Sequence, residues 1–180
     1  MIERDFYTGN EKIAIKGVVG QYSHENLRPL LPTILPALAA DTTIVGKVVG
    51  VHDGDTLTLR TINETLKVRL FGIDTPELGQ PFGNNAKQAL SQMVFGRSVT
   101  ISSTGKDRYG RTLGTVFSQD KGNVNAELVR MGMAWHYRQY SNSTAMQGFE
   151  DYARANRIGL WSDPNPIAPW DWRKGKRHRP

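Results

Sequence analysis

The chain has 180 residues, which is enough for one domain with a sizeable core. Its 38% hydrophobic and 22% charged residues are typical of a soluble globular protein and exclude a fibrous or largely disordered one. With no cysteine, the sequence excludes disulfides, thiolate nucleophiles and cysteine-ligated zinc, and no run approaches the roughly 20 apolar residues of a membrane span. The formal net charge of +6 favours polyanions as partners, although a basic surface without such a partner would give the same sum.

Residues 1–40 are interpreted as a separate N-terminal extension. Acidic and basic side chains balance there, so the positive surplus lies in residues 41–180. Residues 27–40 contain a short apolar stretch that ends in Ala37-Leu38-Ala39, a small-residue pattern typical of signal-peptide cleavage. We therefore expect export, with the protein secreted or periplasmic. The prolines within the stretch leave open a Pro-rich linker or an overlong start, and with it a cytoplasmic protein.

One domain over residues 41–161 begins with three predicted strands. Runs that are rich in β-branched residues or that alternate apolar and polar residues cover residues 44–51, 57–62 and 66–71. The Asp53-Gly54 pair lies where the first turn is expected. The sequence therefore predicts a three-stranded meander.

The rest of the domain shows helix and strand patterns in turn. Apolar residues at helical spacing predict three helices, each ending near a glycine or shortly before one, over residues 84–95, 123–131 and 144–156. Strand character returns between the first two helices, at residues 98–102 and 112–117. This order predicts an α+β, mainly β fold, namely a five-stranded barrel of the OB type with about three α-helices.

Residues 162–180 form a strap rich in proline and tryptophan and then a basic tail. We expect the tryptophans to pack over the barrel or the last helix, with stacking of Trp170 or Trp172 on nucleic-acid bases as the alternative. Basic residues crowd the end of the chain: Arg173, Lys174, Lys176, Arg177 and Arg179. We interpret this tail as a non-specific phosphate contact rather than a folded element, and a solvated tail without a role is the alternative.

Acidic side chains lie at the predicted strand ends. Asp55 opens the second strand and Asp74 ends the third. Because neighbouring strands lie about 4.8 Å apart, both carboxylates could reach one site at the barrel mouth, where oxygen ligands would hold Ca²⁺ or Mg²⁺. Asp53 is better placed to orient these ligands. Taken alone, the Asp53-Gly54-Asp55 motif is more simply a hairpin turn.

The third strand supplies an arginine, and the segment that follows it supplies a candidate base. Pro76 stiffens the turn and places Glu77 just past Asp74, where its carboxylate could accept a proton from water. Arg69 lies in an apolar strand, so its guanidinium needs a partner. A regular strand would point Arg69 and Asp74 to opposite faces, because their separation is odd. We therefore predict a bulge or an early strand end near Gly72.

A second arginine, Arg111, follows a predicted turn that contains Gly110. That turn could place the Arg111 guanidinium at the barrel mouth. Arg69 and Arg111 would then form a pair of planar, permanently charged forks for phosphate oxygens. A solvated surface position for Arg111 is the alternative.

Together these motifs closely resemble the staphylococcal nuclease (thermonuclease-like) family. The matching motifs, in family order, are Asp53-Gly54-Asp55-Thr56, Arg69-Leu70-Phe71-Gly72-Ile73-Asp74-Thr75-Pro76-Glu77 and Asp107-Arg108-Tyr109-Gly110-Arg111. Residues 124–134 match the helix that follows in the family, and Gly159-Leu160-Trp161 matches its usual end. The resemblance covers about residues 43–161.

The resemblance implies a calcium site and a general base. It assigns the ion to the carboxylates of Asp55 and Asp74 and to the backbone carbonyl of Thr75. Glu77 matches the family's proposed general base. The cofactor expected from the resemblance is therefore Ca²⁺.

The resemblance also implies the groups that meet the substrate. Arg69 and Arg111 match the catalytic arginines of the family. The family's later stacking tyrosine does not align cleanly with this chain. The remaining candidates for substrate contact are Arg108 and Tyr109, which align, and Tyr137 and Tyr140, which are alternatives for stacking.

We therefore expect a calcium-dependent endonuclease that hydrolyses DNA and RNA with little sequence specificity, releases 3′-phosphate products and acts as a monomer. The alternative is a catalytically silent OB module that only binds nucleic acid. Such a module needs no cluster of carboxylates, which would repel phosphate unless a cation lay among them. Oligosaccharide binding, a third reading of an OB barrel, leaves the arginines unexplained.

Overall fold

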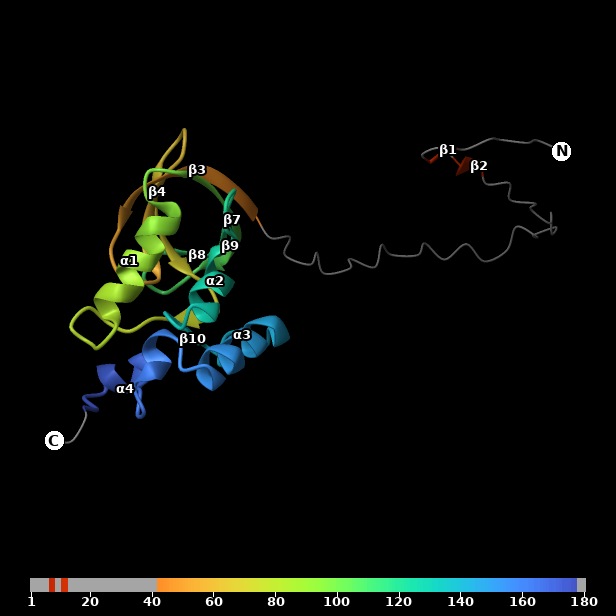
Figure 1. Ribbon diagram of the computed structural model, residues 1–180. Helices are drawn as coiled ribbons and strands as arrows, with labels where there is room; N and C mark the ends of the chain where they lie inside the picture. Colours follow the sequence, from red (N-terminus) through yellow and green to blue (C-terminus); the bar gives the residue numbers. More distant parts are fainter. Residues whose placement is uncertain (1–6, 9–10, 13–41, 178–180) are drawn as a thin grey trace, which may run out of the picture. The chain divides into compact units, whose positions relative to one another are not determined.

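The computed structural model describes residues 7–8, 11–12 and 42–177 (Figure 1). The chain divides into two compact units, Met1–Ala37 and Leu38–Pro180, and each is considered by itself. In the first unit, β1 (Tyr7–Thr8) pairs antiparallel with β2 (Glu11–Lys12). The export segment at residues 27–40 lies outside the described residues and stays a prediction.

The second unit is built around a closed five-stranded barrel. Its strands are β3 (Thr42–Val51), β4 (Thr56–Arg60), β5 (Thr65–Leu70), β7 (Ser98–Lys106) and β8 (Thr112–Ser118). Antiparallel pairing runs in the order β5-β4-β3-β7-β8, and β5 pairs parallel with β8, which closes the barrel. The short strand β9 (Gly122–Asn123) pairs antiparallel with the end of β8. The predicted OB-type barrel is confirmed.

Three of the helices lie where the sequence predicts them, within a residue or two at each end. They are α1 (Gly83–Val94), α2 (Val124–Arg130) and α3 (Thr144–Ala155). The 3₁₀ helix η1 (Gly159–Ser162) and the helix α4 (Pro169–Arg173) were not predicted. Side chains of Asn123 and Ser143 cap α2 and α3 by accepting a hydrogen bond from the backbone of the first turn. No helix within the described residues is long and apolar enough to cross a membrane.

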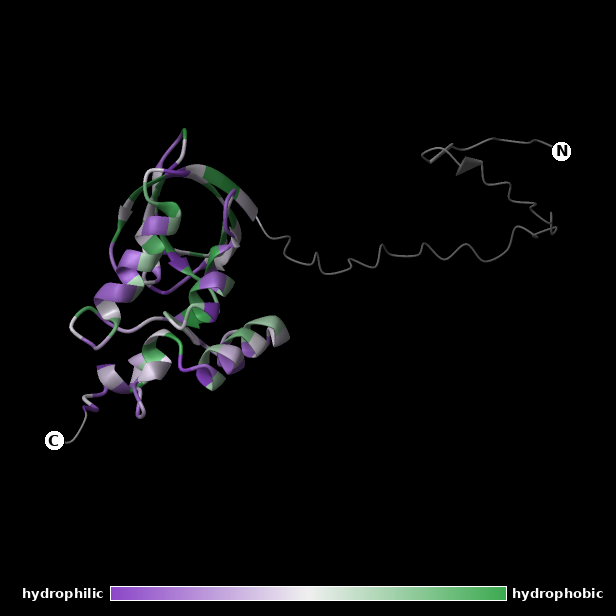
Figure 2. Cartoon of the chain, in the orientation of Figure 1, coloured by the Kyte–Doolittle hydropathy of each residue, from purple (hydrophilic) through white to green (hydrophobic). Residues whose placement is uncertain are grey.

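The core fills the barrel and continues under α1 and α2. Hydrophobic and hydrophilic residues alternate along α1, as Figure 2 shows, and its apolar face is buried. Barrel and helix side chains without solvent exposure meet there, including Val48, Leu57, Leu59, Val68, Leu90, Ile101, Val116 and Leu128. Burial of this apolar surface is the main stabilising contribution to the fold.

The chain turns sharply after β5, at the place where the sequence predicts an irregularity. The strand ends at Leu70, and Gly72 adopts a left-handed backbone with φ of 74°. The next short strand, β6 (Ile73–Asp74), pairs with β10 (Trp135–His136) instead of continuing β5. The predicted early strand end near Gly72 is therefore confirmed. It brings Asp74 back toward the side chain of Arg69.

A buried amide holds this turn against the barrel. Asn125, in α2, has no solvent exposure, and its Oδ1 accepts a hydrogen bond from the Val116 backbone N–H at 3.0 Å. Its Nδ2 donates to the carbonyl of Phe71 at 2.9 Å and to that of Gly114 at 3.2 Å. One side chain therefore satisfies backbone groups of β8 and of the turn after β5. Sequence reasoning assigned no role to Asn125.

We predict that Asn125→Ala lowers the free energy of unfolding by about 2–4 kcal/mol, because it strips hydrogen bonds from buried backbone groups. Urea denaturation followed by circular dichroism measures the change. Asn156→Ala is the matched control, since Asn156 is exposed and makes one side-chain hydrogen bond, to the carbonyl of Tyr152. The control is expected to cost less than about 1 kcal/mol. Equal losses in the two variants would contradict the role of Asn125.

A second pair of variants tests the turn itself. Gly72 and Gly96 have nearly the same φ, 74° and 73°, so alanine is strained by about 1 kcal/mol at both. A Cβ at Gly72 would also approach the Cβ of Ser141 to 2.9 Å, whereas nothing lies within 4 Å at Gly96. We expect Gly72→Ala to lose about twice as much stability as Gly96→Ala in the same urea assay. A Gly72→Ala variant no less stable than Gly96→Ala would show that the turn has room to relax.

Candidate active site

A cavity of about 650 Å³ opens at the barrel mouth, and it brings together every residue that the sequence proposes for the site. The lining includes Asp53, Asp55, Arg69, Asp74, Thr75, Glu77, Arg108, Tyr109, Arg111, Tyr137 and Tyr140. The cavity is also lined by Asp107 and Arg173, which sequence reasoning did not propose for it. The roles of the individual residues stay predictions.

Asp55 is held from several directions just before β4. Its Oδ2 accepts hydrogen bonds from the backbone N–H and the hydroxyl of Thr75, both at 2.9 Å. Its Oδ1 accepts from the hydroxyl of Thr56 at 3.2 Å. The backbone N–H of Asp55 donates to Oδ1 of Asp53 at 3.0 Å, so Asp53 stabilises the turn that carries Asp55. The carboxylate of Asp55 is therefore fixed before any ligand arrives.

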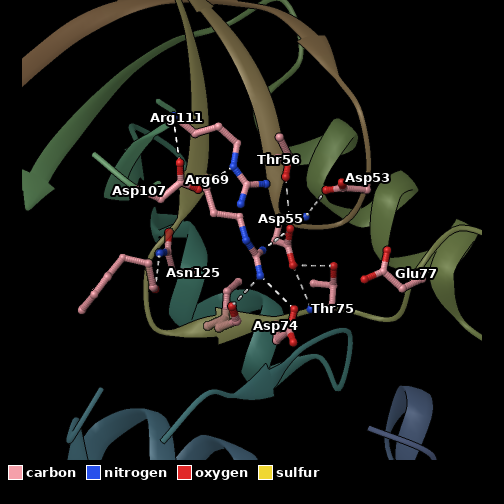
Figure 3. Close-up of polar contacts among 12 residues, drawn as sticks. Asp53, Asp55, Thr56, Arg69, Asp74, Thr75, Glu77, Asp107, Arg111 and Asn125 are labelled. Carbon is pink, nitrogen blue, oxygen red and sulfur yellow. Dashed lines mark hydrogen bonds and ion pairs between the residues drawn. The ribbon is translucent and has the colours of Figure 1, made fainter. Parts of the chain in front are cut away.

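Arg69 extends from β5 between the two buried aspartates (Figure 3). Its Nη2 donates to Oδ1 of Asp74 at 2.8 Å, and its Nη1 forms an ion pair with Oδ1 of Asp55. Burial lowers the pKa of Arg69, and the charge of Asp74 opposes that shift. The ion pairs with Asp55 and Asp74 favour the charged form of the guanidinium. Arg69 thus cross-links the two candidate metal ligands.

Arg111 reaches the cavity from a turn organised by Asp107. Oδ1 of Asp107 accepts from the backbone N–H of Tyr109 and of Arg111, both at 2.9 Å, and Oδ2 accepts from Nε of Arg111 at 2.7 Å. Burial would raise the pKa of Asp107, but its hydrogen bonds from Arg111 lower it overall. Gly110, with φ of 77°, completes the turn. The signal for Asp107 in the sequence was an aspartate at the first position of a turn.

Two tyrosines present exposed rings at the rim. Tyr109 is 68% exposed, and the guanidinium of Arg108 lies 4.8 Å from its ring centroid. Tyr140 is 59% exposed and meets Tyr137 edge to face at 4.9 Å. Both side chains are exposed, but the guanidinium of Arg111 also lies over the Tyr109 ring, 5.5 Å from its centroid.

Tyr137 has a different environment from the other tyrosines. Its ring stacks on Trp170 of α4, with centroids 5.1 Å apart and planes 6° apart. One ring face of Tyr137 is thus covered by the chain itself, so a base could not stack there. Burial also raises the pKa of the Tyr137 phenol.

Glu77 lies just past Asp74 on a loop that is tied down by Gln80. The backbone N–H of Glu77 donates to Oε1 of Gln80 at 3.0 Å, and Nε2 of Gln80 donates to the carbonyl of Ile167 at 2.6 Å. The carboxylate of Glu77 is 40% exposed, so water can reach it. The backbone at Glu77 is therefore held in place, and the side chain extends from it into the cavity.

The basic tail needs a correction, because its first residue belongs to a folded element. Arg173 ends α4, and its Nη2 donates to Oδ2 of Asp74 at 2.7 Å while Nη1 donates to Oε1 of Glu77 at 2.5 Å. Burial would lower the pKa of Arg173, but the hydrogen bonds to Asp74 and Glu77 raise it overall. The sequence offers no signal that separates Arg173 from the neighbouring basic residues. Trp170 stacks on Tyr137, and this packing holds the segment beside the cavity.

The donor set suits a hard divalent ion. Asp55 and Asp74 offer buried carboxylate oxygens, and Asp74 and Glu77 already hold a cationic group, the guanidinium of Arg173. Ca²⁺ and Mg²⁺ take such oxygen ligands and complete their shells with carbonyls and water. Within the described part of the chain, no three carboxylate, histidine or cysteine side chains form a ligand cluster, so a carbonyl such as that of Thr75 and water would have to contribute.

Comparison with known proteins places the chain among nucleases. The family described as "Staphylococcal nuclease homologue" matches residues 67–163. An "Uncharacterized endonuclease" of Haemophilus influenzae is 44% identical over 149 residues, covering 82% of this chain and 83% of the relative. The "Micrococcal nuclease" of Shigella flexneri is 44% identical over 143 residues, covering 74% and 82%. The "Staphylococcal-like nuclease CAN1" of Arabidopsis thaliana is 40% identical over 111 residues, covering 62% and 34%. The barrel, the residues at its mouth and these relatives together show that the chain belongs to the staphylococcal nuclease family.

Proposed function

We propose that this nuclease is a divalent-cation-dependent endonuclease that hydrolyses phosphodiester bonds in DNA and RNA, with Ca²⁺ as the preferred ion and 3′-phosphate products. The observation that carries the proposal is the convergence of Asp55, Arg69 and Asp74 in one cavity with Glu77 and Arg111. Relatives at 44% identity are named as an endonuclease and as a micrococcal nuclease. Sequence-independent cleavage follows from a site that offers groups for phosphate rather than for base edges.

Asp55, Asp74 and the carbonyl of Thr75 would hold the ion. When bound, a divalent ion supplies Lewis-acid chemistry, because it neutralises charge that develops on a phosphate oxygen. The buried ion pairs of Arg69 keep the two carboxylates close together without the ion. The site is therefore preorganised by the chain's own residues.

Glu77 is the group that we assign to proton transfer. Its exposed carboxylate accepts a proton from the attacking water, whose oxygen forms the new bond to phosphorus. The bond from phosphorus to the 5′ oxygen breaks, and that oxygen takes a proton from solvent, which leaves phosphate on the 3′ side. Arg69 and Arg111 donate hydrogen bonds to the non-bridging oxygens as negative charge accumulates there.

A binding-only module is the alternative function, and the charge of the cavity argues against it. Asp53, Asp55, Asp74 and Glu77 all line the cavity. Several carboxylates beside a phosphate would weaken simple binding by like-charge repulsion. The same groups are useful in catalysis, where they hold a cation and accept a proton.

We predict that Glu77→Gln lowers kcat by about 10²–10⁴-fold, because glutamine is nearly isosteric but cannot accept the proton. A plasmid-nicking assay measures the rate. The matched control is Glu64→Gln, which removes the same charge from an exposed turn between β4 and β5. The control is expected to keep its rate within about twofold. Full activity of Glu77→Gln would remove Glu77 from the proposed role.

A second test concerns the ion. We expect a strong chelator to abolish cleavage of plasmid DNA and of a structured RNA, and added Ca²⁺ to restore both more effectively than added Mg²⁺. Restoration by excess ion controls for damage by the chelator, and gel analysis of end-labelled fragments identifies the 3′-phosphate. Unchanged cleavage under chelation would contradict the proposed cation requirement.

A further inference from the structure

The C-terminal strap, taken together with the described part of the basic tail as residues 162–177, places a guanidinium on two carboxylates. These carboxylates are the ones proposed to bind the ion and to accept the proton of water. Arg173 lies 99 positions from Asp74 and 96 from Glu77 in sequence, yet it donates to both side chains. Its fork spans the Asp74 carboxylate, with Nη2 at 2.7 Å from Oδ2 and Nη1 at 3.3 Å from Oδ1. A bidentate contact of this kind is directional and strong for an ion pair.

Two anchors independent of Arg173 hold the strap in this position. Trp170 stacks on Tyr137 at 5.1 Å and meets Trp135 edge to face at 5.5 Å. The buried Gln80 donates to the carbonyl of Ile167 in the strap and accepts from the backbone N–H of Glu77. The strap is therefore fastened to the same loop that presents the candidate base.

Asp74 has little acceptor capacity left for a further cation. A carboxylate offers about four lone-pair directions. Oδ1 already accepts from Arg69 at 2.8 Å as well as from Arg173, and Oδ2 accepts from Arg173. An ion bound to this carboxylate would lie within a few ångströms of the Arg173 guanidinium, where like charges repel. The ion and the guanidinium therefore cannot both make their best contacts with Asp74.

We propose that Arg173 is a built-in competitor of the divalent cation: its guanidinium occupies Asp74 and Glu77 until an ion displaces it, and so the strap sets the ion concentration that the nuclease requires. This inference rests on the proposed cation-dependent function. The displacement needs no unfolding, because the Arg173 side chain is 44% exposed and can turn into solvent while Trp170 keeps α4 docked.

The test is a calorimetric titration of Ca²⁺ into the full chain after treatment with chelator. We expect Arg173→Gln to bind Ca²⁺ roughly tenfold more tightly than the unmodified protein, on the order of typical coupling between two sites. Arg173→Lys, which keeps the charge but loses the fork, should fall between the two. The same tightening should appear as a larger rise of Tm on Ca²⁺ addition for Arg173→Gln.

Lys174→Gln is the matched control. Lys174 follows Arg173 at the end of α4, is exposed, and pairs with no carboxylate among the described residues. Removing its charge should change the Ca²⁺ affinity less than twofold, so a general electrostatic effect is separated from competition at Asp74. An equal gain in Lys174→Gln and Arg173→Gln would overturn the proposal.

The remaining outcomes distinguish this inference from the proposed function. Ca²⁺ binding of equal strength in the unmodified protein and in Arg173→Gln would overturn the competition and leave the cation-dependent nuclease intact. Weaker binding in Arg173→Gln would also overturn it, because Arg173 would then support the ion site. Absence of Ca²⁺ binding in every variant would overturn both the competition and the proposed ion.

Discussion

Arg69 has a side chain that is only 14% exposed, and its guanidinium lies between Asp55 and Asp74. A charge so far from water is tolerated only with partners, and removing one partner of a buried pair typically costs about 3–5 kcal/mol. The barrel must therefore deliver both carboxylates to one point. The turn at Gly72 brings Asp74 to Arg69, and the hydrogen bonds from Thr75 hold Asp55 beside it.

The same pairing explains how one cavity combines carboxylates and arginines. Three arginines of the cavity are paired with carboxylates before a substrate arrives: Arg69 with two aspartates, Arg111 with Asp107 and Arg173 with Asp74 and Glu77. A phosphate that binds Arg69 would have to share that guanidinium with the two aspartates. In the proposed function, ion binding, strap contacts and substrate binding would be linked through shared side chains, and such a linkage is reciprocal in free energy.

Much of the fold was predictable because its signals are local. β-branched runs bounded by turn residues gave five strands, and apolar spacing ending near glycine gave three helices. The early end of β5 was predicted from the odd separation of Arg69 and Asp74. Side chains an odd number of residues apart in a regular strand point to opposite faces, so these two could not otherwise meet. The short helix α4 has no comparable signal, because five residues hold too few positions for a periodic pattern, and its stability comes from packing.

The sequence by itself determined the barrel, the family and most of the residues gathered at the barrel mouth, because motif spacing within consecutive strands and turns defines them. Only the tertiary structure decided the contacts between distant segments. Asn125 satisfies a carbonyl 54 positions away, and Arg173 reaches Asp74 across 99 positions. Such contacts depend on the register and packing of the folded chain, to which an isolated asparagine or arginine in the sequence gives no guide.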